Sequence, residues 1–316
     1  MLMSARRTKH KNPWILIGLG ALCILPVIFL APLFFHESLP ARVGVVIVSD
    51  PMVVCSFDLE RNVLTAVRIP PDIAVDLTRG YGTYPVSSLW KLDRMDKRQG
   101  ALLMETMEEA LGIPLRYYRE FSPVPPGVPI RDQLGRAFSF SSFFSTLFRK
   151  QQTNIPSWLY FAIRRGIGDM NPSNFRVFDL SESPVFFEET RADGSTVRKI
   201  DLGKWSLLLG TYAEDTLIRK ENLRISIVNS TDTPGLAQKL TRVLETLGYH
   251  IRSIGNLENV KTDRCTIRGN GKIRETHTVK TLLSLYRCSF EADQEESQND
   301  GTFIIGADFE KRYISF

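Results

Sequence analysis

Four cysteines and four histidines are the side chains of this 316-residue sequence best suited to metal binding, and their spacing indicates no metal site. The sequence also lacks the Gly-x-Ser-x-Gly elbow, the P-loop and the His-Glu-x-x-His zinc motif. Cys23 lies in an apolar run and Cys55 in a strand-like run. Cys265 and Cys288 remain. An oxidising compartment would allow them a disulfide, and two buried free thiols explain them equally well.

Two aspartates beside prolines are the carboxylates whose surroundings suggest a specific role. Asp50 precedes Pro51. An aspartate at this position is equally suited to forming a turn and to binding a ligand. Asp72 follows Pro70-Pro71, and an aspartate at such a position commonly accepts hydrogen bonds from its own turn. We therefore expect Asp72 to stabilise a turn rather than to bind a metal ion.

An uncharged run near the N-terminus predicts how the chain is placed in a cell. The run from Trp14 to Phe35 holds 22 residues, enough to cross about 30 Å of hydrocarbon as a helix. The basic residues before it account for four of the net +5 charges: Arg6, Arg7, Lys9 and Lys11. By the positive-inside rule, residues 1-12 form a cytoplasmic tail and residues 13-36 a transmembrane helix, with the bulk of the chain extracytoplasmic.

A cleaved signal peptide is the alternative to a retained anchor. The apolar run is long for a signal peptide, and the residues that follow it lack a small-x-small cleavage pattern. We therefore predict a single-pass protein of the cell membrane. Without the N-terminal basic residues the chain is almost neutral, so its charge gives no reason to expect nucleic acid binding.

The region after the anchor has the pattern of an α/β domain. Runs rich in β-branched residues predict strands at 42–48, 52–57 and 63–69. Apolar residues at helical spacing predict a helix from Lys97 to Leu111 with Gly112 as its cap, and 113–118 resembles a further strand.

Beyond a proline-rich breaker at 122–129, aromatic residues recur at helical spacing between Phe138 and Ile163. Such stripes usually form core, and the alternatives are a groove for a lipid tail or a surface lying on the membrane. Farther along, Asp193-Gly194 predicts the turn of a β-hairpin.

The C-terminal region predicts a second, smaller α/β domain of roughly βαββαβ order. Its strands are expected at 223–229, 249–255, 263–268 and 302–305, with helices after Thr233-Pro234 and at 276–287. The acidic stretch 291–301 is expected to be a surface loop. The fold class is therefore α/β, with one transmembrane helix, a domain at 42-215 and a small domain at 220-310.

Two segments resemble the LytR-CpsA-Psr family of bacterial envelope proteins. Residues 48–75 and 101–118 are similar to a family region with Arg-x-Asp and Ile-Pro-Arg-Asp motifs and a helix ending in Leu-Gly-Ile-Pro. The C-terminal region resembles the family's LytR-type C-terminal domain, in which a strand ends in Asn and a helix begins at Gly-Leu-Ala and ends at Gly. The matching residues here are Asn229, Gly235, Leu236, Ala237 and Gly248, and Gly306-Ala307-Asp308 is similar to a closing Leu-Gly-x-Asp.

The resemblance implies a phosphoryl-transfer chemistry. Family members with intact sites move a polyprenyl-pyrophosphate-linked polymer onto peptidoglycan, which requires arginine forks and a divalent metal held by carboxylates. Asp50 and Asp72 match family acidic positions, but Val48 and Pro71 stand where the family has arginines. Arg68 lies three residues before Pro71 and points to the opposite face of a strand, so it cannot simply replace the missing side chain.

The missing arginines favour a non-catalytic envelope protein with a degenerate N-terminal domain, which binds a cell-wall glycopolymer or an envelope protein and needs no cofactor. The alternative is a phosphotransferase that attaches a polyprenyl-pyrophosphate-linked glycopolymer to peptidoglycan, with Mg²⁺ on Asp50 and Asp72. Its positive charge would come from Arg68, Arg79, Lys91 or Arg94, with the Phe-rich segment 138–163 around the lipid tail. The family also bears a transcriptional-regulator label, yet a tail of about a dozen residues is too short for a DNA-binding fold.

Overall fold

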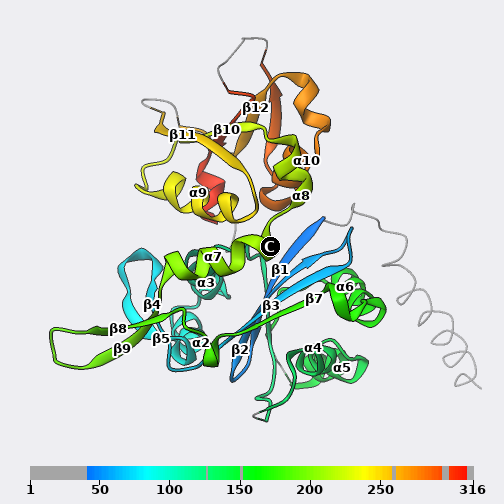
Figure 1. Ribbon diagram of the computed structural model, residues 1–316, viewed down its shortest axis with the longest axis vertical. Coiled ribbons are helices and arrows are strands. Elements are labelled where there is room, and N and C mark those ends of the chain that lie inside the picture. Colours follow the sequence, from blue (N-terminus) through cyan, green and yellow to red (C-terminus); the bar gives the residue numbers. More distant parts are fainter. Residues whose placement is uncertain (1–40, 126, 150–151, 258–260, 294–298, 312–316) are drawn as a thin grey trace, which may run out of the picture.

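The computed structural model describes residues 41–125, 127–149, 152–257, 261–293 and 299–311. Within them the chain is a mixed α/β protein with three β-sheets. A central sheet and a hairpin sheet build the first part of the chain, and a C-terminal sheet lies above them in Figure 1. The expected membrane span from Trp14 to Phe35 lies outside the described residues. No helix in the described ranges is both long and apolar enough to cross a bilayer.

The central sheet has the strand order β6-β1-β2-β3-β7. Its strands are β1 (Arg42–Val48), β2 (Met52–Asp58), β3 (Val63–Ile69), β6 (Tyr117–Glu120) and β7 (Phe175–Asp179). β1, β2 and β3 are antiparallel neighbours, whereas β6 runs parallel to β1 and β7 parallel to β3. The predicted strands 42–48 and 63–69 are confirmed to the residue, and the strand predicted at 113–118 forms only from Tyr117.

Helices cover both faces of the central sheet, so the first part of the chain has three layers (Figure 1). One face carries Val46 and Val54 and packs against α2, α3 and α7. The other carries Val45 and Cys55 and packs against α4 and α6. The bounds are α2 (Val86–Met95), α3 (Ala101–Leu111), α4 (Ile130–Ala137), α5 (Phe140–Arg149), α6 (Ser157–Asp169) and α7 (Leu202–Ala213). Because alternate side chains of a strand point to opposite faces, the apolar runs of β1 and β2 supply both cores.

The helix predicted from Lys97 is wrong at its start. Lys97 and Gln99 have φ angles of 54°, in the left-handed region, so no right-handed helix can pass through them. The preceding helix α2 ends at Met95, and its buried Asp93 accepts hydrogen bonds from the backbone N–H of Gly100 (2.6 Å) and Leu103 (3.1 Å). Asp93 therefore satisfies free N–H groups at the start of α3 and fixes the corner between the two helices.

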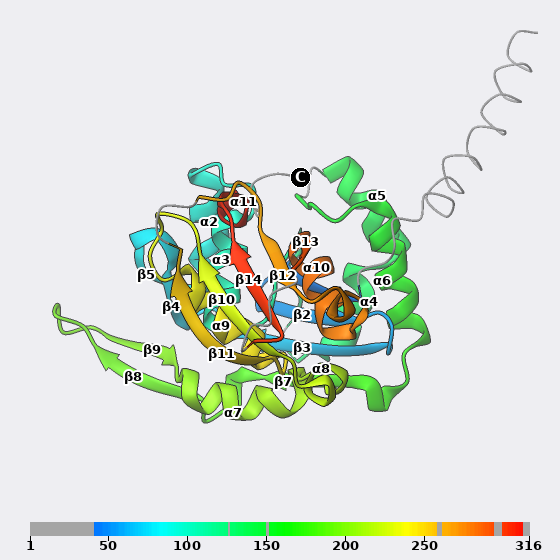
Figure 2. The same ribbon diagram turned by 90° about the horizontal axis from the view of Figure 1, so that it is seen from above.

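The hairpin sheet has the order β5-β4-β9-β8 and projects from the side of the molecule in Figure 2. Its strands are β4 (Ala74–Leu77), β5 (Gly82–Pro85), β8 (Phe186–Thr190) and β9 (Thr196–Ile200). Gly194 has a φ of 80°, so the hairpin predicted around Asp193-Gly194 is confirmed. Short 3-10 helices lie at Thr78–Gly80, Pro172–Asn174, Leu180–Glu182 and Gly271–Glu275.

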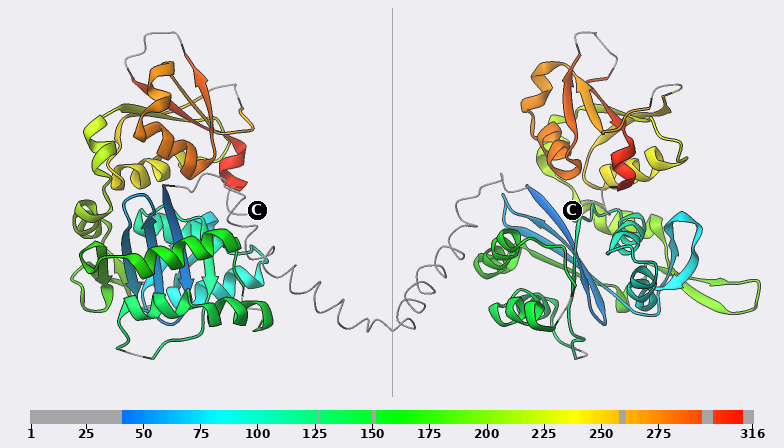
Figure 3. Two further views of the ribbon diagram at one scale, coloured as in Figure 1. Left: turned by 90° about the vertical axis from the view of Figure 1, so that its right-hand side faces the viewer. Right: turned by 180° about the vertical axis from the view of Figure 1, so that it is seen from behind.

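The C-terminal sheet has the order β11-β10-β14-β12-β13 and its own apolar core. The elements are β10 (Arg224–Asn229), β11 (His250–Asn256), β12 (Thr266–Gly269), β13 (Ser289–Ala292), β14 (Gly301–Ile305), α8 (Thr216–Glu221), α9 (Leu236–Thr246), α10 (His277–Tyr286) and α11 (Ala307–Lys311). Figure 3 shows α8, α9 and α10 on the side of this sheet that faces the central sheet.

Two sequence predictions for this part need correction. The helix expected to open at Thr233-Pro234 begins at Leu236, because Gly235 before it has a φ of 80°. The segment expected to be a loop from Glu291 begins instead within β13, an edge strand parallel to β12. The order is therefore βαββαββ rather than βαββαβ.

Candidate functional site

Asp50 lies in the tight turn between β1 and β2, and a cis peptide bond joins it to Pro51. Its side chain is exposed, and its backbone oxygen accepts a hydrogen bond from the N–H of Val124 at 3.4 Å. Ser49, the preceding residue, donates a hydrogen bond from its hydroxyl to the backbone oxygen of Pro51 at 2.8 Å. Asp50 therefore sits at the carboxyl end of β1, where a carboxylate is open to solvent.

Asp72 follows β3 and makes a different contact from the one expected. Its carboxylate accepts a hydrogen bond from Arg198 of β9 at 3.0 Å, and both side chains are partly exposed. Arg198 also lies over the ring of Phe186 at 4.8 Å. The structure thus gives the Asp72 carboxylate an ion-pair partner on the hairpin sheet instead of a bond to its own turn.

Arg68 is the cation nearest in the sequence to the two aspartates, and it is mostly buried on β3. Its guanidinium pairs with Asp179 of β7 at 3.0 Å and donates to the backbone oxygen of Val128. Burial by itself raises the pKa of Asp179, but hydrogen bonds from Ser181 and the charge of Arg68 hold it below its ordinary value. Arg68 therefore faces an ionised carboxylate.

Gln133 of α4 connects Arg68 with the turn that carries Asp50. It is fully buried, and its amide oxygen accepts from Arg68 at 3.3 Å. Its amide nitrogen donates to the Ser49 hydroxyl at 2.9 Å and to the Pro51 backbone oxygen at 3.3 Å. The structure therefore brings Arg68 and the Asp50 turn to one end of the central sheet. No sequence signal marked Gln133, because its partners are far away along the chain.

These contacts do not form a metal site of carboxylates. No hydrogen bond or ion pair between described residues joins Asp50, Arg68 and Asp72 to one another. Across the described ranges, no three histidine, cysteine, aspartate or glutamate side chains gather closely enough to hold a metal ion.

Arg119 of β6 is a buried cation that sequence reasoning missed. It is only 1% exposed, and its guanidinium donates to the Ser142 backbone oxygen (2.9 Å), the Ser142 hydroxyl (2.9 Å) and the Thr146 hydroxyl (2.7 Å). It also lies over the Tyr160 ring at 4.8 Å. Burial lowers its pKa, and within the described part of the chain it has no carboxylate partner. A charge held in this way binds helices α5 and α6 to the sheet edge through neutral acceptors.

The C-terminal motif residues close the connection from β10 to α9. The buried Asn229 side chain donates to the Thr233 backbone oxygen at 2.9 Å and accepts from the N–H of Thr231 at 3.0 Å. Leu236 and Ala237 are buried in the core beneath the sheet. Gly248 has a φ of 93°, and a Cβ there would lie 2.8 Å from Glu214. Each motif residue therefore has a structural reason for its type.

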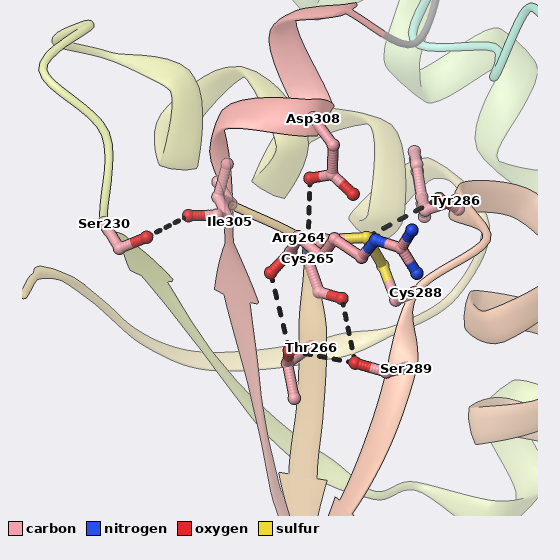
Figure 4. Close-up of a disulfide and its surroundings, with 9 residues drawn as sticks. All are labelled: Ser230, Arg264, Cys265, Thr266, Tyr286, Cys288, Ser289, Ile305 and Asp308. Carbon is pink, nitrogen blue, oxygen red and sulfur yellow. Dashed lines mark hydrogen bonds between the residues drawn. A yellow bond between two sulfur atoms is a disulfide. The ribbon is translucent and has the colours of Figure 1, made fainter. Parts of the chain in front are cut away.

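Cys265, just before β12, and Cys288, just before β13, form a disulfide (Figure 4). The Cys265 N–H donates to the Asp308 carboxylate at 2.8 Å, and burial raises the pKa of that carboxylate. A Cβ on Gly306 would lie 2.4 Å from the backbone carbon of Arg264. The closing Gly306-Ala307-Asp308 segment thus packs directly on the disulfide-bonded strand.

Replacing both cysteines by serine is expected to lower the stability of this part of the chain. A cross-link with a sequence separation of 23 residues stabilises a fold by about 3 kcal/mol, chiefly by restricting the unfolded chain. Thermal unfolding of the double variant Cys265→Ser/Cys288→Ser should show a lower midpoint temperature than the wild type. The variant Cys55→Ser, which changes a thiol outside the cross-link, is measured for comparison. Equal midpoints for the double variant and the wild type would show that the bond contributes nothing.

The family comparison identifies this C-terminal part. Residues 222–309 match the family model LytR_C, described as LytR cell envelope-related transcriptional attenuator. This segment is a LytR_C domain. The predicted resemblance to a LytR-type C-terminal domain is confirmed, and Asn229, Gly235 and Gly248 lie inside the matched residues of the LytR_C domain. A search of curated proteins finds no match.

Solved structures with which the chain aligns include LytR-CpsA-Psr proteins. The transcriptional regulator yvhJ from Bacillus subtilis is 12% identical, with a TM-score of 0.39, over 55% of this chain and 95% of that one. The LytR-CPS2A-psr family protein YwtF (TagT) with bound octaprenyl pyrophosphate lipid is 14% identical, with a TM-score of 0.37, over 55% and 90%. A transcriptional regulator from Enterococcus faecalis is 10% identical, with a TM-score of 0.40, over 67% and 88%.

A buried carboxylate joins the LytR_C domain to the central sheet. Asp215, just before α8, accepts hydrogen bonds from Arg61 of the β2–β3 turn (2.5 Å) and from His277 of α10 (3.0 Å). It also caps α8, accepting from the N–H of Leu217 at 2.9 Å. Burial raises the pKa of Asp215, but the bonds from His277 and Leu217 and the charge of Arg61 together hold it below its ordinary value.

Proposed function

We propose that this chain is a membrane-anchored, extracytoplasmic envelope protein that binds a cell-wall glycopolymer or an envelope partner without transferring a phosphoryl group. The LytR_C domain supplies the envelope connection. The N-terminal domain, in this proposal, is a divergent LytR-CpsA-Psr domain that has lost the phosphotransferase chemistry.

The commitment of the candidate side chains to other protein groups carries this proposal. Arg68 already has an ionised partner in Asp179, and Asp72 has one in Arg198. A pyrophosphate needs several unengaged guanidinium groups aimed at one point, with a metal ion between carboxylates. At the two positions where the resemblance calls for arginine, Val48 is buried in the core and Pro71 has no side-chain donor. The arrangement favours binding over catalysis.

The disulfide supports an extracytoplasmic location. Disulfides persist in oxidising compartments and are rare in a reducing cytosol. The Cys265–Cys288 bond lies within the LytR_C domain, the part that we place outside the membrane.

A transfer assay with the full chain in vesicles tests the proposal. The chain is incubated with a lipid-pyrophosphate glycan, an acceptor wall fragment and Mg²⁺, and an active family member serves as the positive control. We expect no polymer on the acceptor, while wall fragments still sediment with the chain. Magnesium-dependent product would contradict a non-catalytic role.

A rearranged phosphotransferase is the second candidate, and the bridge through Gln133 favours it. That bridge places Arg68 beside the turn of Asp50. If this candidate holds, the double variant Asp50→Ala/Asp72→Ala loses magnesium-dependent lipid binding. The matched control Asp193→Ala/Asp232→Ala, which removes two other surface carboxylates, keeps it. Equal binding by both double variants would remove the case for this candidate.

A further inference from the structure

Helices α4, α5 and α6 present an outer face that combines exposed aromatic rings with arginines, here called the α4–α6 face. We define it by Arg131, Arg136, Phe140, Phe144 and Arg164. Phe140 is 50% exposed and Phe144 43% exposed, which is unusual for phenylalanine in a packed domain. In Figure 1 these helices lie along one side of the central sheet, away from α2, α3 and α7.

The inward-facing aromatic rings of the same segment pack against one another between the helices. Phe138 packs against Tyr160 at 5.3 Å between ring centroids, and Phe143 against Phe161 at 5.1 Å. The aromatic segment therefore divides between core and surface. Its inner rings form the core, and its outer rings Phe140 and Phe144 remain on the α4–α6 face.

The charge on this face is predominantly positive. Two shallow clefts, of about 400 and 500 Å³, are lined by four arginines and two aspartates. One of the aspartates, Asp169, is paired with Arg165 at 3.4 Å, while Arg136 has no side-chain partner in the described part of the chain. Arg164 lies over the Phe140 ring at 4.1 Å. Arg131 and Arg164 donate to backbone oxygens, of Met170 at 3.4 Å and Phe138 at 3.1 Å, and pair with no carboxylate of the described residues. Exposed aromatic rings beside arginines without carboxylate partners are the composition of surfaces that lie in the headgroup region of an anionic bilayer.

The length of the connection to the anchor keeps this face near a membrane. This step rests on the proposed function, in which the apolar run that ends at Phe35 lies in the bilayer. Only residues 36–41 then separate the run from β1. Such a connection reaches at most about 25 Å. The last residue of α6, Asp169, accepts a hydrogen bond from Asn62 of the β2–β3 turn at 3.4 Å. Arg42 at the start of β1 pairs with Asp58 at the end of β2, next to the β2–β3 turn that α6 contacts. The end of α6 therefore lies beside the end of β1 to which the connection is joined.

We propose that the α4–α6 face lies on an anionic lipid surface and orients the domains relative to the membrane. Phe140 and Phe144 enter the headgroup region, and Arg131, Arg136 and Arg164 attract lipid phosphates. The LytR_C domain packs on the end of the central sheet where Arg61 and Asp215 meet, and in Figure 1 its strand β11 lies away from α4 and α5, so β11 stays outside this contact.

A fluorescent label on the full chain tests this orientation. Ser141 is exposed between the two rings, so the variant Cys23→Ala/Ser141→Cys receives an environment-sensitive fluorophore and is reconstituted into vesicles of phosphatidylcholine with or without phosphatidylglycerol. We expect shorter-wavelength emission and quenching by brominated lipid in the phosphatidylglycerol vesicles. Adding Arg136→Gln should lower the ratio of docked to undocked protein about fivefold, whereas Arg252→Gln on β11 should not. A label at Ile254→Cys, exposed on β11 of the LytR_C domain, should stay unquenched.

The outcomes separate the orientation from the proposed function. Protein that floats with the vesicles while the Ser141 label stays unquenched in both lipid mixtures would overturn the orientation and leave the anchored role standing. Equal quenching at Ser141 and Ile254 would also overturn it. Protein that fails to float with either vesicle would overturn the anchor itself, and the orientation with it.

Discussion

Replacing Asp215 by alanine is expected to cost roughly 4 kcal/mol of stability, because a buried charge pair loses one member and a helix loses its cap. The Asp215 side chain is only 4% exposed, and its carboxylate accepts hydrogen bonds from both Arg61 and His277. Without it, His277 loses its acceptor and the start of α8 loses a cap. The cost stays moderate because the Arg61 side chain is 29% exposed and can turn toward water.

The same substitution should also loosen the LytR_C domain from the central sheet. A second ion pair that crosses between the two parts, Lys239 with Glu109 at 2.7 Å, is partly exposed and contributes little by itself. Chemical unfolding of Asp215→Ala should separate into two transitions, and limited proteolysis should cut near residue 215. The matched variant Asp232→Ala removes an exposed carboxylate and should unfold like the wild type. A single unshifted transition for Asp215→Ala would contradict a coupling role.

The Asp215 contribution also has a defined pH dependence. Its pKa is lower in the folded chain than in the unfolded chain, so the ionised form stabilises the fold. That stabilisation is complete above the unfolded value of about 3.9 and is lost as the pH falls through the folded value. The stability difference between wild type and Asp215→Ala should therefore shrink as the pH falls below about 4. A difference that grows under acid would have the wrong sign.

Truncating Trp205 to alanine is expected to cost a similar amount, roughly 4 kcal/mol, because it leaves a large cavity in the core. Trp205 of α7 is 2% exposed and meets the Phe178 ring edge-on at 5.9 Å. Its indole N–H donates to the Leu111 backbone oxygen at 2.9 Å, which would lose that partner. Trp205 thus joins α7, the end of α3 and strand β7.

A second position on the same helix provides the control. Leu207 is 81% exposed, so Leu207→Ala should change the unfolding free energy by less than about 0.5 kcal/mol. Denaturant titration of both variants gives the comparison. If Trp205→Ala and Leu207→Ala were equally stable, α7 would not pack on the central sheet as described.

The sequence predicted best those elements whose pattern is local. β1 and β3 have their predicted bounds because β-branched runs end at turn residues on both sides. The hairpin of β8 and β9 followed from Asp193-Gly194. Helix α7 was missed because Trp205 and Leu209 face the core while other apolar side chains, such as Leu207, face solvent, so its stripe is blurred.

The site was less predictable because its partners lie far apart along the chain. Arg198 is 126 residues from Asp72, and Asp179 is 111 residues from Arg68. A single sequence places Asp72 after two prolines, but it contains no local signal for the ion pair that the structure assigns to it. Arg119 was missed for the same reason, since its neutral partners Ser142 and Thr146 carry no charge pattern.

Labelling one exposed cysteine in intact cells tests most directly whether the folded domains lie outside the membrane. In the described part of the chain the free thiol, Cys55, is buried, so Leu207→Cys adds an accessible one. With Cys23→Ala as background, a membrane-impermeant maleimide should label Leu207→Cys in intact cells and leave the background chain unlabelled. Labelling that required broken cells would place the domains in the cytoplasm and contradict an envelope role.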